Sequence, residues 1–127
     1  MADTGMPFSD LMGVEILERE KTRVVGRLVV RTDLCTSGGI LHGGAYMAFA
    51  DALGAIGGVL NLAEGTWTTT LESKTNFLRG APVGSVVTCE ATPLHIGRRS
   101  SVWQTRLTND DGKLLALVTQ TQMTIEG

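Results

Sequence analysis

The chain has 127 residues, of which 43% are hydrophobic and 19% charged, a composition typical of a globular protein, and we expect one domain over residues 1–127. Its 11 Lys and Arg against 13 Asp and Glu give a formal net charge of -2 without a long run of either sign, so we expect neither nucleic acid nor a membrane as partner. Cys35 and Cys89 lie far apart without metal-ligand spacing, which predicts reduced thiols, no metal site and a cytoplasmic location.

The N-terminal half is predicted to form two strands, a loop and a helix. Residues 14–20 and 22–30 are the strands. In the second, one face holds Val24, Leu28 and Val30, and the face expected in water holds Arg23, Val25, Arg27, Val29 and Arg31. Residues 36–44 contain four glycines and predict a flexible loop. Residues 45–60 carry apolar side chains on every side and are too few to span a bilayer, which predicts a buried core helix.

The C-terminal half is predicted to consist of four consecutive strands at residues 66–78, 85–94, 100–108 and 113–125. The first is expected to point Trp67, Leu71, Thr75 and Phe77 one way, and Thr68, Thr70, Glu72, Lys74 and Asn76 the other. Turns are expected at 80–84, 95–99 and 109–112. The last strand places on one side Leu115, Leu117, Thr119, Thr121, Met123 and Ile125.

This order of elements predicts an α+β fold, with an antiparallel sheet of about six strands packed on one helix. One helix cannot cover a sheet of that width. The uncovered surface and the exposed strand edges favour self-association, so we expect at least a homodimer.

Asp51 is the strongest indication of chemistry, because it is the only charged side chain in the predicted core helix. Burying a carboxylate without a partner is costly, and Asp is a poor helix former. Either the helix has one wet side to which Asp51 points, or the carboxylate has a function. We favour the second interpretation.

Gly43 and Gly44 begin this helix, where backbone N–H groups lack intrahelical partners and a carbonyl oxygen can approach closely. The segment His42-Gly43-Gly44 is therefore suited to polarising a substrate carbonyl. Gly43 precedes Asp51 by eight residues, about 12 Å along a helix, so one carbonyl cannot meet both groups of one subunit. A two-fold dimer with antiparallel helices would bring Asp51 of one chain near Gly43 of the other.

Several motifs together resemble the PaaI-like hotdog-fold acyl-CoA thioesterases. In chain order they are His42-Gly43-Gly44, Asp51 within ADALG, TLESKTNFLR at 70–79, HIGRR at 95–99 and DGK at 111–113. The resemblance covers nearly the whole chain, and its specificity comes from the order and spacing of the motifs. It implies a sheet wrapped around one long helix, subunits paired into a double-width sheet, and a dimer of dimers.

The resemblance also implies roles for particular residues. Asp51 would activate water or attack the thioester carbonyl, and the Gly43 amide would polarise that carbonyl. Thr36 stands where the family often has Asn or Gln, and Thr70 where some members carry Ser or Thr near the attacking water. The implied catalytic set is Asp51, Gly43, Thr36, Thr70 and His42, the last without a part in proton transfer. The implied substrate-binding set is Gly44, Phe77, Leu78, Arg79, Gly97, Arg98, Arg99 and Ser100.

The expected reaction is hydrolysis of an aromatic or medium-chain acyl-CoA, with no cofactor beyond the CoA of the substrate. Pro7, Phe8, Leu11 and Met12, together with residues 54–60, are expected to line the acyl pocket. Two alternatives stay open. One is a hotdog-fold dehydratase or hydratase acting on a hydroxyacyl thioester, which would use His42 with an acid. The other is a non-catalytic acyl-CoA-binding protein.

Overall fold

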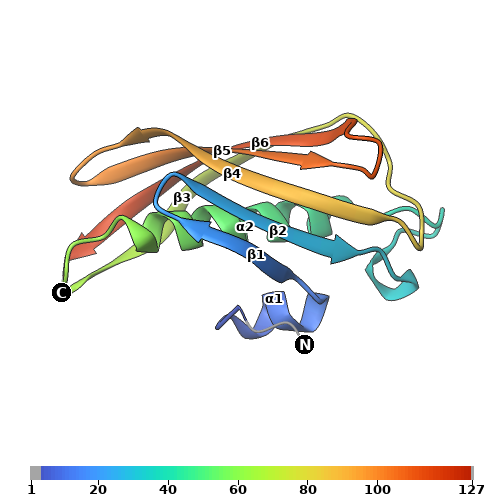
Figure 1. Cartoon of the computed structure of the whole chain (residues 1–127), viewed down its shortest axis with the longest axis horizontal. Coiled ribbons are helices and arrows are strands. Elements are labelled where there is room, and N and C mark those ends of the chain that lie inside the picture. Colours follow the sequence, from blue (N-terminus) through green and yellow to red (C-terminus); the bar gives the residue numbers. More distant parts are fainter. Residues whose placement is uncertain (1–3, 127) are drawn as a thin grey trace.

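A computed structural model describes residues 4–126 as one antiparallel sheet packed on one long helix (Figure 1). In chain order the elements are α1 (Pro7–Met12), β1 (Glu15–Glu20), β2 (Arg23–Val29), the 3-10 helix η1 (Thr32–Leu34), α2 (Gly43–Leu60), β3 (Thr66–Phe77), β4 (Val86–Ile96), β5 (Ser100–Thr108) and β6 (Leu114–Glu126). The strand order is β1-β2-β4-β5-β6-β3, and every neighbouring pair is antiparallel. The predicted α+β hotdog architecture is confirmed.

Helix α2 runs along the concave face of the sheet and forms the centre of the core (Figure 1). Within the described residues it is the one helix long and apolar enough to cross a membrane, but 56% of it is buried inside the fold. Gly57 allows its close approach to the sheet, because a Cβ at that position would lie 2.5 Å from the ring of Trp103. The prediction of a buried core helix is therefore correct.

The predicted alternation of β3 is wrong beyond its first half, because a bulge interrupts the strand between Thr70 and Glu72. Thr68 and Thr70 face α2, and after the bulge the inward positions become Ser73 and Thr75. Thr75 therefore shares a face with Thr70 and not with Trp67, whose side chain is exposed. One extra residue in a strand reverses the side-chain phase of everything after it.

The water-facing side of β2 also differs from prediction at Val25, which is 8% exposed. Its register partners are Glu18 on β1 and Glu90 on β4. Arg23 forms ion pairs with both glutamates. Long charged side chains commonly lay their apolar stems over such a neighbour, which accounts for the low exposure of Val25.

The structure differs from the prediction in three further places: an additional short helix, an ordered loop and a longer strand. The short helix α1, with Pro7 in its first turn, was not predicted. The segment 36–44 is held by hydrogen bonds rather than left flexible, since Thr36 N–H donates to the Ile40 carbonyl at 2.8 Å and Leu41 N–H to the Ala81 carbonyl at 2.8 Å. Strand β4 continues to Ile96, which confines the next turn to residues 97–99.

Candidate active site

The carboxylate of Asp51 lies half-buried between α2 and the sheet, where two side chains donate hydrogen bonds to it. Thr70 Oγ1 on β3 donates to Asp51 Oδ1 at 2.8 Å, and Gln120 Nε2 on β6 donates to the same oxygen at 3.0 Å. No described residue donates to Oδ2. One oxygen is thus fixed and the other is available to a water molecule or a substrate.

A chain of hydrogen bonds sets the direction of the Thr70 bond. Gln122 Nε2 donates to Thr70 Oγ1 at 2.7 Å, so the single hydroxyl proton of Thr70 is left for Asp51. Thr68 Oγ1 donates to Gln122 Oε1 at 3.0 Å, which orients that amide. Because the groups facing Asp51 are all donors, they suit an ionised carboxylate, which can only accept.

At the start of α2 the two glycine amides have different partners. Gly44 N–H donates to His42 Nδ1 at 2.8 Å, so His42 caps the helix and carries its ring proton on Nε2 when neutral. The Gly43 N–H has no hydrogen-bond acceptor among the described residues. It is the open donor at the positive end of the helix dipole, the arrangement expected of an oxyanion hole.

The Gly43 cavity, as we call it, opens beside that amide and has a volume of about 380 Å³. Its lining gathers several predicted site residues with the end of β3, and consists of Thr36, Ile40, Leu41, Gly43, Tyr46, Phe77, Leu78, Arg79 and Gly80. Thr36 Oγ1 accepts a hydrogen bond from Gly38 N–H at 3.2 Å. Tyr46, which the sequence did not indicate, donates its hydroxyl to the Arg79 carbonyl at 3.0 Å, and burial raises the pKa of its phenol.

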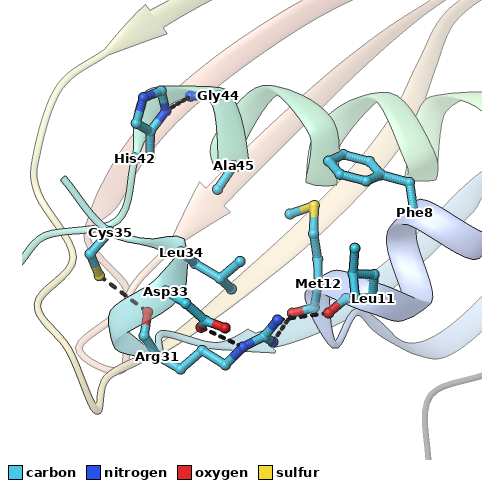
Figure 2. A pocket seen from close by; sticks show the side chains of 10 residues that line it. All are labelled: Phe8, Leu11, Met12, Arg31, Asp33, Leu34, Cys35, His42, Gly44 and Ala45. Atoms are coloured by element: carbon cyan, nitrogen blue, oxygen red, sulfur yellow. Dashed lines mark hydrogen bonds and ion pairs between the residues drawn. The ribbon is translucent and has the colours of Figure 1, made fainter.

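A second cavity of about 510 Å³, here the N-terminal cavity, lies between α1 and the start of α2 (Figure 2). Side chains from α1, η1 and α2 surround it, namely Phe8, Leu11, Met12, Arg31, Asp33, Leu34, Cys35, His42, Gly44 and Ala45. Arg31 holds α1 in place, because its guanidinium donates to the carbonyls of Leu11 at 2.7 Å and Met12 at 2.6 Å. Asp33 pairs with the Nε of Arg31 at 2.7 Å.

The expected acyl pocket is divided between two places. Phe8, Leu11 and Met12 line the N-terminal cavity, while Ala55, Ile56, Val59 and Leu60 line a separate cavity of about 210 Å³ at the other end of α2. The two expected halves of that pocket do not meet in this chain.

The turn at Gly97, Arg98 and Arg99 is also distant from the end of β3. Ser100 pairs with Met123 on β6, whereas Phe77 pairs with Ala116 on the same strand. Seven strand residues separate these two β6 positions, which corresponds to about 23 Å. One chain therefore does not bring the predicted arginine turn and the residues 77–79 to a common place.

Besides Tyr46, the sequence analysis missed Gln120 and Gln122. Both glutamines are 1% exposed and point toward α2 from β6, so the inward face of this strand is the one opposite to Thr119, Thr121 and Met123, which the sequence pattern had placed on its apolar side. Their alternate spacing is a signal that becomes informative only when the inward face of β6 is known. Within residues 4–126, no three His, Cys, Asp or Glu side chains gather closely enough to hold a metal ion.

Comparison with known proteins identifies the family. Residues 38–116, more than half of the chain, match the family described as "Thioesterase superfamily". A 1,4-dihydroxy-2-naphthoyl-CoA hydrolase of Listeria monocytogenes is 30% identical over 112 residues, covering 88% of this chain and 90% of the relative. The chain belongs to the thioesterase superfamily.

Solved structures agree with this assignment. A thioesterase of Haemophilus influenzae superposes with a TM-score of 0.88 at 30% identity, over 94% of this chain and 82% of that one. The PaaI protein of Escherichia coli, from a phenylacetic acid degradation operon, has the same fold, with a TM-score of 0.89 at 21% identity over 96% and 86% of the chains. Two other relatives, from Haemophilus influenzae and Pasteurella multocida, are matched over only 54% and 56% of their length.

Proposed function

We propose that the protein hydrolyses the thioester of an aromatic or medium-chain acyl-CoA to the free acid and CoA. The observation that carries this is the pair of groups on α2: a carboxylate fixed through one oxygen, and an open backbone amide at the helix start. The Gly43 N–H stabilises the negative charge on the thioester oxygen. Asp51 acts as general base toward water or as nucleophile on the carbonyl carbon, and the thiolate of CoA leaves. The reaction needs no cofactor.

We propose a site shared between two subunits, with β3 of one chain paired to β3 of the other. β3 is an edge strand of 12 residues, and exposed apolar side chains accompany it, including Trp67, Leu71 and Phe77. An antiparallel pairing of two such edges extends the sheet across a two-fold axis. A further pairing of dimers into a tetramer is part of the proposal.

The proposed two-fold axis passes through two midpoints, one on α2 and one on β3. On α2, Met47 is midway between Gly43 and Asp51, and its side chain is 38% exposed. A two-fold axis at Met47 therefore places Gly43 of one subunit opposite Asp51 of the other. On β3, the midpoint between Thr70 and Phe77 lies between residues 73 and 74. An axis at that point places Thr70 of one subunit opposite Phe77 of the other. Phe77 lies against Gly43, and Thr70 is bonded to Asp51. One axis through both midpoints brings all four residues together.

The same axis joins the CoA-binding residues that one chain keeps apart. Residues 77–79 of one subunit come beside Thr70 of its partner, two strands from the turn formed by Gly97, Arg98, Arg99 and Ser100. We assign the pantetheine arm to the Gly43 cavity and the phosphates of CoA to the arginine turn, because guanidinium groups match phosphate geometry. The larger, mainly apolar N-terminal cavity takes the acyl group. A cytoplasmic location fits the two free cysteines, of which Cys89 is fully buried with a raised pKa.

A thiol-release assay on the purified protein tests the proposed function. We expect turnover of phenylacetyl-CoA, hydroxybenzoyl-CoA or a medium-chain acyl-CoA, and slower turnover of acetyl-CoA, which leaves the N-terminal cavity empty. An enoyl product from a hydroxyacyl-CoA would instead support the dehydratase reading. Tight CoA binding without turnover of any thioester would support a binding protein.

Mixing two inactive variants tests the shared site. In a heterodimer of Asp51→Asn and Gly43→Pro, one site combines both intact groups and the other combines both altered ones. Random exchange of subunits in an equal mixture should therefore restore about a quarter of wild-type activity. Each variant alone, carried through the same unfolding and refolding step, is the control. A mixture no more active than its components would place both groups of the site in one chain.

A further inference from the structure

We propose that Gln120 is a positioning residue for Asp51, which it holds so that Oδ2 faces the thioester and the attacking water. This inference rests on the proposed function and assigns a role to a side chain on β6 that meets neither the substrate nor the reacting atoms.

The first observation is the geometry of the amide. Gln120 Nε2 lies 3.0 Å from Asp51 Oδ1 and 3.4 Å from the backbone carbonyl oxygen of the same residue. One NH₂ group thus contacts both the side-chain carboxylate and the backbone carbonyl of Asp51. Together with Thr70, which donates to Oδ1 from the opposite strand β3, it fixes the rotation of the carboxylate.

The second observation is that Gln120 is poorly satisfied as a core residue. Its side chain is 1% exposed, and its Oε1 has no hydrogen-bond partner among the described residues. Ser73, opposite Gln120 in the register, does not provide one, because its own hydroxyl is also buried without a partner. A buried carbonyl oxygen without a donor lowers the stability of the folded state. Packing therefore gives no reason for glutamine at this position.

The third observation is that α2 makes room for the amide. Gly54, one helical turn after Asp51, lies against the end of Gln120, and a Cβ at Gly54 would come 2.3 Å from Gln120 Oε1. Glycine in a helix interior is itself unfavourable. Gly54 on α2 and Gln120 on β6 are each locally unfavourable. Together they place one hydrogen-bond donor beside Asp51 Oδ1.

The experiment compares three variants in the full-length protein. Gln120→Met keeps the volume of the side chain and removes the donor. Gln120→Glu replaces the amide by a group that donates to Asp51 only when it is protonated. Gln104→Met is the matched control, because Gln104 lies on β5 between Trp103 and Thr105, which face α2, and so points away from the helix. For each variant we measure kcat, KM, the melting temperature and the pH profile of kcat.

We expect Gln120→Met to lower kcat about 10- to 100-fold, the effect of losing a hydrogen bond to a charged group, with KM nearly unchanged and the melting temperature equal or higher. Gln120→Glu should regain activity as the pH falls, since two adjacent carboxyl groups hold a shared proton at low pH. Gln104→Met should behave like the wild type. Asp51 is the only ionisable group in the hydrogen-bonded set of Thr68, Thr70, Gln120 and Gln122, so the new pH dependence belongs to this pair.

Several outcomes would overturn the assignment. An unchanged kcat in Gln120→Met shows that the amide does not position Asp51. A loss of kcat that accompanies a lower melting temperature, without recovery of Gln120→Glu at low pH, shows a structural role. A wild-type protein that hydrolyses no thioester overturns the proposed function itself, whereas the first two outcomes leave that function standing.

Discussion

Asp51→Asn is expected to lower kcat by about 10²- to 10⁴-fold, the usual contribution of a positioned base, and by more if Asp51 is the nucleophile. The asparagine Oδ1 can still accept the hydrogen bonds that Thr70 and Gln120 donate to Asp51 Oδ1. Shape and packing are therefore kept while the basic oxygen is lost. Thiol release with the preferred acyl-CoA measures the effect.

Two controls accompany this variant. The melting temperature and the oligomeric state should match those of the wild type, and Asp51→Ala should be equally inactive. A single turnover in ¹⁸O-water tests the nucleophilic role of the carboxylate, because label enters Asp51 only if water cleaves an acyl anhydride at the Asp51 carboxyl carbon, whereas label only in the product acid shows that water attacks the acyl carbon. Wild-type turnover in Asp51→Asn would remove Asp51 from the catalytic set.

Gly43→Pro is the second variant with a large expected effect, since it deletes the proposed oxyanion donor. Proline is tolerated at the first position of a helix, where its missing N–H makes no intrahelical bond. His42, with φ -62° and ψ 139°, already has the extended conformation that a residue before proline requires. We expect kcat to fall about 10²- to 10³-fold, as when one oxyanion-hole donor is lost.

Gly43→Ala is the matched control for this change. Alanine adds the same Cβ, which would lie 3.2 Å from Cε1 of the half-exposed Phe77 ring, but keeps the N–H. Both variants therefore disturb Phe77 alike, and only the proline lacks the donor. Equal losses in the two variants would mean that crowding of Phe77, rather than the amide, limits the reaction.

Much of the fold can be predicted from the sequence, because apolar and polar residues are clearly separated in the elements that form the core. The run of apolar residues in α2 and the apolar face of β2, with Val24 and Leu28, leave little choice of element. Asp51 and Gly43 are also visible in the sequence, one as a charge in an apolar helix and the other as a glycine at the helix start. Their separation along α2 leads to the hypothesis of a site shared between two subunits, which the mixing of the two variants tests.

The remaining features lack such a signal. α1 has only six residues and no side-chain cap, so its formation depends on Met12 reaching the core and on Arg31 binding its last carbonyls. Near the bulge in β3 most residues are polar, and a polar run does not report which face is inward. Gln120 and Gln122 were not recognised because the apolar residues of β6 were expected on the opposite face, whereas the buried face carries these two amides beside Asp51 and Thr70.

The bulge at Leu71 constrains how this protein can vary in length. Thr70 and Phe77 are seven residues apart, an odd number, and a regular strand would turn them to opposite faces. The bulge restores a common face, so that one side chain reaches Asp51 and the other lies against Gly43. Deleting a single residue between them would leave one end of the site facing solvent, whereas paired deletions or a relocated bulge would not. Within this strand, related sequences should therefore differ in length by two residues at a time, or carry their extra residue elsewhere between the same two positions.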